Sequence, residues 1–202
     1  MKLKRVLCMA LAAVMAAGSL GTLDAVNTKA AVEDEFEFDK DTKTIVKYNG
    51  TQSNVEIPST IDGVNVTTIG EDAFSSNEYI ETVEIPDSVT TIENEAFLNC
   101  PNLGYVEMSD NVKSLGRLSF FMCESLESIK VKSGLVCIGT NAFYDSYAET
   151  VEISSTVKTI EDYAFTYNTN LNSIVIPEGV ISIDEGAFLL CSSLTEISFP
   201  DS

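Results

Sequence analysis

Short runs of alternating apolar and polar residues recur seven times along the chain. They begin at residues 55, 83, 106, 129, 151, 174 and 197, and five of the six intervals between them are 22 or 23 residues long. Alternation of this kind predicts a β-strand with one buried face, and the Pro that ends several runs cannot extend a hydrogen-bonded ladder. One strand about every 23 residues predicts a solenoid, because a single coil cannot bury its own apolar face and must stack on the next.

A second pattern, a Phe preceded by a small residue, alternates with these runs at the same period. The phenylalanines are Phe74, Phe97, Phe120, Phe143, Phe165 and Phe188. We expect their rings to form a buried spine, since the small residue before each Phe leaves room for the ring of the next coil. Acidic residues such as Glu71 and Asp72 precede several of these pairs, and we expect them at the amino-terminal ends of short helical turns, where carboxylates are favoured.

The fullest copy of the combined unit runs from Leu171 to Cys191, with the sequence LNSIVIPEGVISIDEGAFLLC. It resembles the repeat of the BspA-type leucine-rich repeat proteins of bacterial and some protist surfaces, and the resemblance covers residues 52–202. It implies a mainly β solenoid, a leucine-rich repeat array with one short parallel strand per coil and short helical turns. Departures such as Ala148 in place of Leu, or Leu118-Ser119 in place of a small residue and Ala, weaken single coils only.

Three segments are expected. Residues 1–30 are predicted to be a secretory signal peptide, because a basic start precedes an apolar run shorter than the roughly 20 residues that span a bilayer, and Thr28-Lys29-Ala30 offers a cleavage site. Residues 31–51 predict a β-hairpin that caps the amino-terminal edge of the array. Residues 52–202 predict about six 23-residue coils plus a final strand. No cap is predicted at the carboxyl-terminal edge, so this edge is either open to a partner, including an end-to-end contact, or covered in a longer native product.

The charge balance excludes several functions. The chain has 12 Lys and Arg, 31 Asp and Glu and no His, with a formal net charge of -19, and removal of residues 1–30 would leave 8 basic and 30 acidic residues. Such a chain is unsuited to nucleic acid or to anionic membrane surfaces. Without His, neither Ser-His-Asp nor Cys-His catalysis nor a His-based metal site can form. We therefore expect no catalytic residue, no cofactor, and no membrane insertion after cleavage of the signal.

The exposed residues of the predicted strands are the best candidates for binding. The residue between the two buried positions forms the column Glu56, Glu84, Glu107, Lys130, Glu152, Val175 and Ser198, with Tyr105 in the column beside it. One hypothesis is that Glu84, Tyr105, Glu107, Lys130 and Glu152 form a charged docking surface for a basic partner; another is that the carboxylates hold Ca²⁺ between coils. The alternative is that this face is exposed to solvent and has no binding role.

A further column lies three residues after each Phe. It contains Asn77, Cys100, Cys123, Ser146, Asn168 and Cys191. In leucine-rich repeats this inward position holds Asn or Cys, so we expect a structural ladder that satisfies backbone groups at the bend. Cys100 and Cys123 on adjacent coils would be close enough for a disulfide. Cys137, in a small polar column near the surface, is the thiol expected to be reactive, and no Cys-x-x-Cys motif is present to form a zinc ribbon.

These observations favour a secreted or cell-surface module that binds a protein partner, such as a basic host or matrix surface, without catalysis. The family resemblance implies adhesion and binding of host or matrix proteins. The alternative is a non-catalytic targeting or structural arm of a larger exported enzyme or surface protein.

Overall fold

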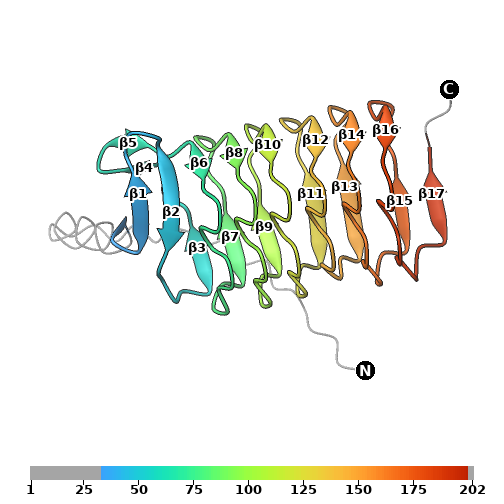
Figure 1. Cartoon of the computed structure of the whole chain (residues 1–202), viewed down its shortest axis with the longest axis horizontal. Coiled ribbons are helices and arrows are strands. Elements are labelled where there is room, and N and C mark those ends of the chain that lie inside the picture. Colours follow the sequence, from blue (N-terminus) through green and yellow to red (C-terminus); the bar gives the residue numbers. More distant parts are fainter. Residues whose placement is uncertain (1–32, 200–202) are drawn as a thin grey trace, which may run out of the picture.

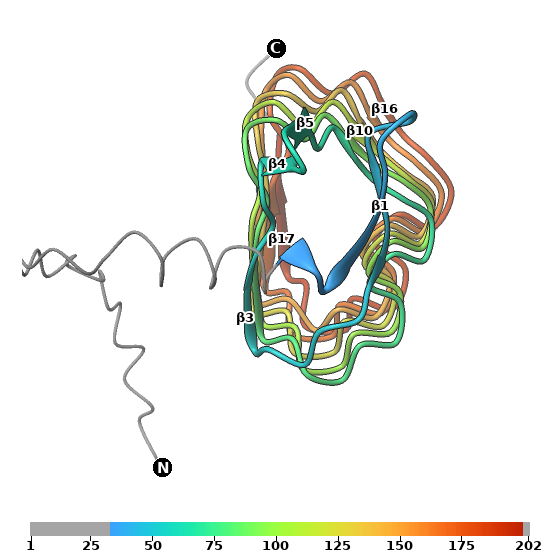
Figure 2. The same ribbon diagram turned by 90° about the vertical axis from the view of Figure 1, so that its left-hand side faces the viewer.

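A computed structural model of the chain describes residues 33–199. These residues form an elongated β-solenoid whose coils stack side by side from the amino-terminal to the carboxyl-terminal end (Figure 1). Seen along the stacking direction, the coils superpose around a common core (Figure 2). The predicted fold class and the solenoid architecture are therefore confirmed.

One row of strands, here called the main row, comes from the alternating runs that begin at residues 55 to 197. Its members are β3 (Asn54–Glu56), β7 (Thr82–Glu84), β9 (Tyr105–Glu107), β11 (Ser128–Val131), β13 (Thr150–Ile153), β15 (Ser173–Val175) and β17 (Glu196–Ser198). Every hydrogen-bonded pair within this row is parallel and in the same register, so that Val55 pairs with Val83 and Val83 with Val106. The constant register carries each repeat position from coil to coil as a column.

Each coil also contains a second, shorter strand that we had not predicted. The second row consists of β2 (Thr44–Tyr48), β6 (Thr68–Ile69), β8 (Thr91–Ile92), β10 (Ser114–Leu115), β12 (Cys137–Ile138), β14 (Thr159–Ile160) and β16 (Ser182–Ile183). Apart from β2, these strands have two residues each, which is too short for alternation to be recognised in a sequence. The prediction of one strand per coil was therefore incomplete.

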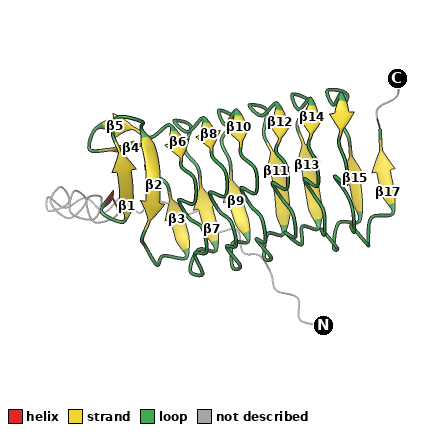
Figure 3. Cartoon of the chain, in the orientation of Figure 1, coloured by secondary structure: helices red, strands yellow, loops and turns green. Residues whose placement is uncertain are grey.

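The predicted short helical turns are wrong. Loops connect the strands throughout residues 33–199 (Figure 3), and helical geometry occurs only at Glu33. Each turn has positive φ at two positions, for example 58° at Asp72 and 58° at Ser76, which a helix cannot contain. Alternate N–H groups of these turns donate to the next coil instead, as Phe74 N does to Ala96 O at 2.7 Å, and those between them donate within the turn, as Ala73 N does to Gly70 O at 3.2 Å.

Some of the acidic residues that precede the Ala-Phe pairs consequently have a different role from the one expected. Glu93 Oε2 accepts a hydrogen bond from Glu71 N of the preceding coil at 3.1 Å, and Asp162 Oδ1 accepts one from Glu185 N of the following coil at 2.9 Å. These carboxylates join neighbouring coils and do not lie at the start of a helix.

Two hairpins lie at the amino-terminal end. β1 (Phe36–Asp39) pairs antiparallel with β2, which in turn pairs parallel with β6. The first interval between the alternating runs, from residue 55 to residue 83, is 28 residues and thus about five longer than the others. It contains a second hairpin, formed by β4 (Thr60–Ile61) and β5 (Val64–Asn65), with Asp62 and Gly63 both at positive φ in its turn. An Asp-Gly pair suits such a turn because both of its central residues need positive φ.

The phenylalanine spine is confirmed. Phe74, Phe97, Phe120 and Phe165 are at most 1% exposed, and neighbouring ring centroids along the spine are 4.7 to 5.5 Å apart. The spine continues into the amino-terminal hairpin, since the Tyr48 ring stacks on Phe74 at 5.0 Å. The described residues include no helix long and apolar enough to cross a membrane.

Candidate protein-binding face

The solvent-facing side of the main row, here called the main face, contains all five residues proposed for docking. Glu84 lies on β7, Tyr105 and Glu107 on β9, Lys130 on β11 and Glu152 on β13. Parallel register places Glu84 beside Glu107 and Lys130 beside Glu152. The structure therefore brings these residues onto one face, although it does not leave them equally available to a partner.

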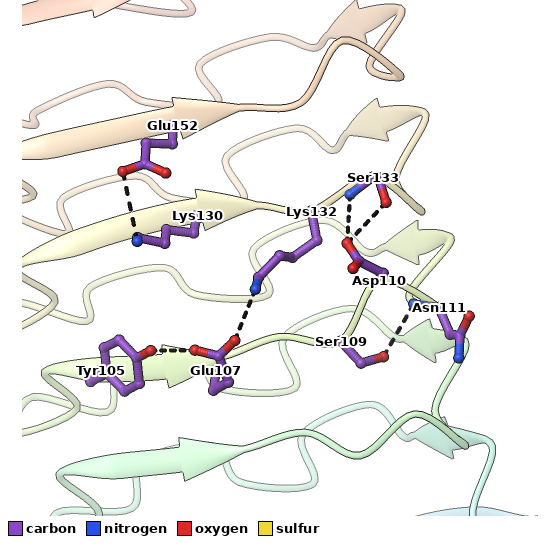
Figure 4. Close-up of polar contacts among 9 residues, drawn as sticks. All are labelled: Tyr105, Glu107, Ser109, Asp110, Asn111, Lys130, Lys132, Ser133 and Glu152. Carbon is purple, nitrogen blue, oxygen red and sulfur yellow. Dashed lines mark hydrogen bonds and ion pairs between the residues drawn. The ribbon is translucent and has the colours of Figure 1, made fainter. Parts of the chain in front are cut away.

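The middle of the main face is occupied by contacts within the chain (Figure 4). Lys132 Nζ lies 2.8 Å from Glu107 Oε1, and the hydroxyl of Tyr105 donates to the other oxygen of Glu107. Lys130 Nζ lies 3.7 Å from Glu152 Oε1. The hydrogen bond from Lys132, followed by that from Tyr105, holds the pKa of Glu107 below its ordinary value. Glu107 therefore stays charged within a paired cluster.

The amino-terminal part of the main face is different. Glu56 and Glu84 are exposed and adjacent in register, and neither forms an ion pair or a side-chain hydrogen bond with another residue in the range 33–199. Two carboxylates one strand apart repel each other, at a cost of roughly 0.2 to 1 kcal/mol. A positively charged partner would relieve this repulsion.

A groove of about 820 Å³ lies over the same strands. Glu56, Glu84 and Tyr105 contribute to its lining, and Pro58 and Pro86 stand at the ends of two strand runs beside it. Sequence reasoning missed this groove and left Glu56 out of the favoured set. The recurring Val-Glu-Ile-Pro phrase at residues 55–58 and 83–86 was the available signal, because it repeats the same carboxylate and proline on adjacent coils.

The main face provides no ligand set for calcium. Within residues 33–199, no group of three or more acidic, Cys or His side chains is arranged to hold a metal ion. The hypothesis that Ca²⁺ lies between coils therefore finds no support in this part of the chain.

The six residues of the inward column lie at the bend after each Phe. The thiols of Cys100, Cys123 and Cys191 donate to the carbonyls of Phe74, Phe97 and Phe165, one coil earlier, at 3.1, 3.2 and 3.1 Å. Ser146 Oγ donates to Phe143 O at 2.6 Å, and Asn77 Nδ2 donates to Gly50 O at 3.3 Å. Each of these side chains thus bonds to a backbone carbonyl at the bend.

Asn168 makes three side-chain hydrogen bonds within this column's bend. Its Nδ2 donates to Phe143 O at 2.8 Å and to Phe165 O at 2.9 Å, while its Oδ1 accepts from Ala148 N at 3.0 Å. Because Asn168 is fully buried, these three bonds satisfy backbone groups that water cannot reach.

The four described cysteines are free thiols. Cys100 and Cys123 are fully buried, and burial raises the pKa of Cys123 well above its ordinary value. Cys137 is only partly buried, but its surroundings are the opposite of those that activate a thiol. Burial and a hydrogen bond to Glu161, at 3.2 Å between Sγ and Oε1, raise its pKa to about 12. The structure therefore contradicts the expectation that Cys137 is reactive.

Comparison with known proteins agrees with this architecture. The chain is similar to the T. pallidum leucine rich repeat protein TpLRR, with 29% identity over 82% of this chain and 79% of that one, and a TM-score of 0.78. It is also similar to a leucine rich cell surface protein of Faecalibacterium prausnitzii A2-165, with 29% identity, 81% coverage of this chain and a TM-score of 0.60. A leucine-rich repeat protein of Bacteroides ovatus shares the fold at 24% identity, 82% coverage of this chain and a TM-score of 0.57.

The chain spans about half the length of the second and third of these structures, 52% and 51% respectively. No curated protein matches it in sequence. The BspA type leucine rich repeat region matches in six copies over residues 44–168 and 90–202. With its stacked coils and buried phenylalanine spine, this protein belongs to the BspA-type leucine-rich repeat family.

Proposed function

We propose that this chain is a secreted or cell-surface protein that binds a protein partner through the amino-terminal part of the main face, without catalysis. Family membership supports a protein-binding role. A surface location is supported by the similar Faecalibacterium prausnitzii protein, which is described as a cell surface protein. The observation that carries the proposal is the position of Glu56 and Glu84, two adjacent glutamates beside the groove that form no ion pair within residues 33–199.

The partner expected from this chemistry has a basic surface. Glu56 and Glu84 project from adjacent parallel strands, so the spacing of their backbones is set before binding and only the side chains lose conformational freedom. Their charge, within a chain of net charge -19, attracts cationic surfaces from a distance and repels acidic ones. Binding of this kind weakens as salt shortens the range of the attraction.

The test compares the proteins retained by the immobilised chain with those retained by two double variants. Glu56→Gln with Glu84→Gln removes both carboxylates from the main face. Glu78→Gln with Glu124→Gln removes two exposed carboxylates elsewhere and leaves the net charge the same as in the first variant. We expect that the unmodified chain and the Glu78→Gln, Glu124→Gln control both retain a partner protein at low salt. The Glu56→Gln, Glu84→Gln variant should bind the same partner about tenfold more weakly. Equal loss in both variants, or no salt-sensitive partner at all, would contradict the proposal.

A further inference from the structure

Two glutamates of the main face are placed so that a single cationic group could contact both. Glu56 on β3 and Glu84 on β7 occupy the same position on adjacent parallel strands. Such strands lie about 4.8 Å apart, so both carboxylates can reach the same group above the sheet. Within residues 33–199 neither glutamate forms an ion pair or a side-chain hydrogen bond. The carboxylate oxygens of the pair are therefore available to a ligand.

An aromatic ring lies beside this pair. In the register of the main row, Tyr105 pairs with Thr82 and Glu107 with Glu84, so Tyr105 lies on the strand next to Glu84 and diagonally across from it. Tyr105 is 41% exposed and lines the groove. Its hydroxyl donates to Glu107, whose other carboxylate oxygen is paired with Lys132 (Figure 4). These contacts orient the ring before a ligand binds.

The groove ends where the main face becomes basic. β9 is the last strand of the main row that contributes to the lining of the groove. Lys130 lies on β11 of the next coil, and Lys132 directly follows that strand. A cation that moved beyond β9 would meet these two lysines and be repelled. The favourable positions for a cation therefore lie over β3 and β7, beside Glu56 and Glu84.

An arginine side chain fits these features better than a lysine side chain. The planar guanidinium has five N–H donors, so it can bond to two carboxylates at once and still lie flat on an aromatic ring. A cation within about 6 Å of the centre of a tyrosine ring is attracted by that ring. The lysine ammonium is a compact and strongly hydrated point charge, which gains less from a planar surface.

We propose that the groove binds an arginine side chain of the partner protein, with the guanidinium bonded to Glu56 and Glu84 and stacked on Tyr105. This inference rests on the proposed function, because the same groove binds the partner, and it names the chemical group that is recognised. Tyr105 provides the preference for Arg over Lys. Glu107 and Lys132 are positioning residues, which act on the ligand only through the orientation of the Tyr105 ring.

The test measures the binding of three tripeptides to the isotope-labelled protein by nuclear magnetic resonance. Each peptide has blocked ends and a Gly on either side of a central Arg, Lys or citrulline; citrulline keeps the planar shape of Arg without its charge. The Arg peptide should shift the backbone amides of β3, β7 and β9 and bind about tenfold more tightly than the Lys peptide. The citrulline peptide should bind about tenfold more weakly than the Arg peptide, or worse. Equal binding of the Arg and Lys peptides would overturn the proposal.

Protein variants locate the bound guanidinium. Glu84→Gln should weaken binding of the Arg peptide by about tenfold, since it removes one of the two carboxylates. Tyr105→Leu should weaken it by about fivefold and reduce the preference for Arg over Lys. Tyr79→Leu is the matched control: Tyr79 is 57% exposed and lies outside the groove, so this variant should bind within about twofold of the unmodified chain. Equal losses in the two tyrosine variants would overturn the proposal. The spectrum of each variant shows whether it is folded.

The outcomes separate this inference from the proposed function. If the Arg and Lys peptides bind equally and both lose affinity in Glu84→Gln, the groove binds basic groups without selecting Arg. That result overturns the inference and leaves the proposed function standing. If the retained partner protein binds equally well after Glu56→Gln with Glu84→Gln, the proposed function fails, and the inference that rests on it fails too. Absence of any shift in β3 and β7 with the Arg peptide would overturn the inference alone.

Discussion

At the scale of single residues, neighbours on adjacent coils determine chemical behaviour. Cys137 and Glu161 are 24 positions apart in the sequence, yet the thiol donates to this carboxylate at 3.2 Å. Burial alone would raise the pKa of Glu161, but hydrogen bonds from Cys137 and from Thr140 outweigh it and lower that pKa. A stable carboxylate beside Cys137 opposes formation of the thiolate.

Cys137 should therefore react slowly with a disulfide reagent such as Ellman's reagent at pH 8, because its pKa of about 12 leaves little thiolate. Its rate should rise steeply as the pH increases toward 12. Glu161→Gln should lower the thiol pKa and speed the reaction at pH 8 several-fold. Stopped-flow absorbance measures the rate, and Cys137→Ser identifies the signal of this thiol. A rate equal to that of a free cysteine would contradict the prediction.

At the scale of the repeated element, the turn after each second-row strand positions the phenylalanine spine. The residue preceding Phe is Ala in five coils and Ser119 in the third. The hydroxyl of Ser119 is buried without a hydrogen-bond partner among the described residues, which gives a physical reason why Ala is preferred there. The Phe120 ring nevertheless keeps its place, 5.0 Å from Phe97 and 5.4 Å from Phe143.

Phe120→Ala should lower the free energy of unfolding by about 3 to 5 kcal/mol, because it removes a fully packed ring from the centre of the stack. Phe121→Ala offers a matched control, since Phe121 is the next residue and is only partly buried, against Tyr144. Its cost should be clearly smaller. Urea denaturation followed by circular dichroism gives both values. Similar losses in the two variants would show that the spine is not the main source of stability in this coil.

At the scale of the whole molecule, net charge and stacking act together. Stacking repeats the same positions at short spacing, so the excess of 31 acidic over 12 basic residues is partly arranged in columns such as Glu56, Glu84 and Glu107. Within residues 33–199, Glu107 has a lysine partner and Glu56 and Glu84 have none. Many of the other acidic side chains are exposed to solvent, so salt should screen the repulsion between them.

The melting temperature should therefore rise by a few degrees as NaCl is increased from about 0.01 M to about 0.1 M, over which the screening length falls from roughly 30 Å to about 10 Å. Partner binding should weaken over the same range, so the two properties should respond in opposite directions. CaCl₂ at matched ionic strength serves as the control for specific metal binding. A fall in melting temperature with NaCl would contradict the prediction, and a much larger rise with CaCl₂ would indicate a calcium site.

The sequence by itself determined the solenoid, its period and its buried columns, because each coil repeats the same pattern of apolar residues and stacking is the only way to bury them. The Phe spine and the residues of the main face follow from that period. Tertiary structure alone decided which charges are free, since the Lys132 to Glu107 pair depends on side-chain reach between coils. It also decided the turns, where positive φ at residues such as Leu118 and Tyr163 goes against local propensity and is held by hydrogen bonds to the next coil.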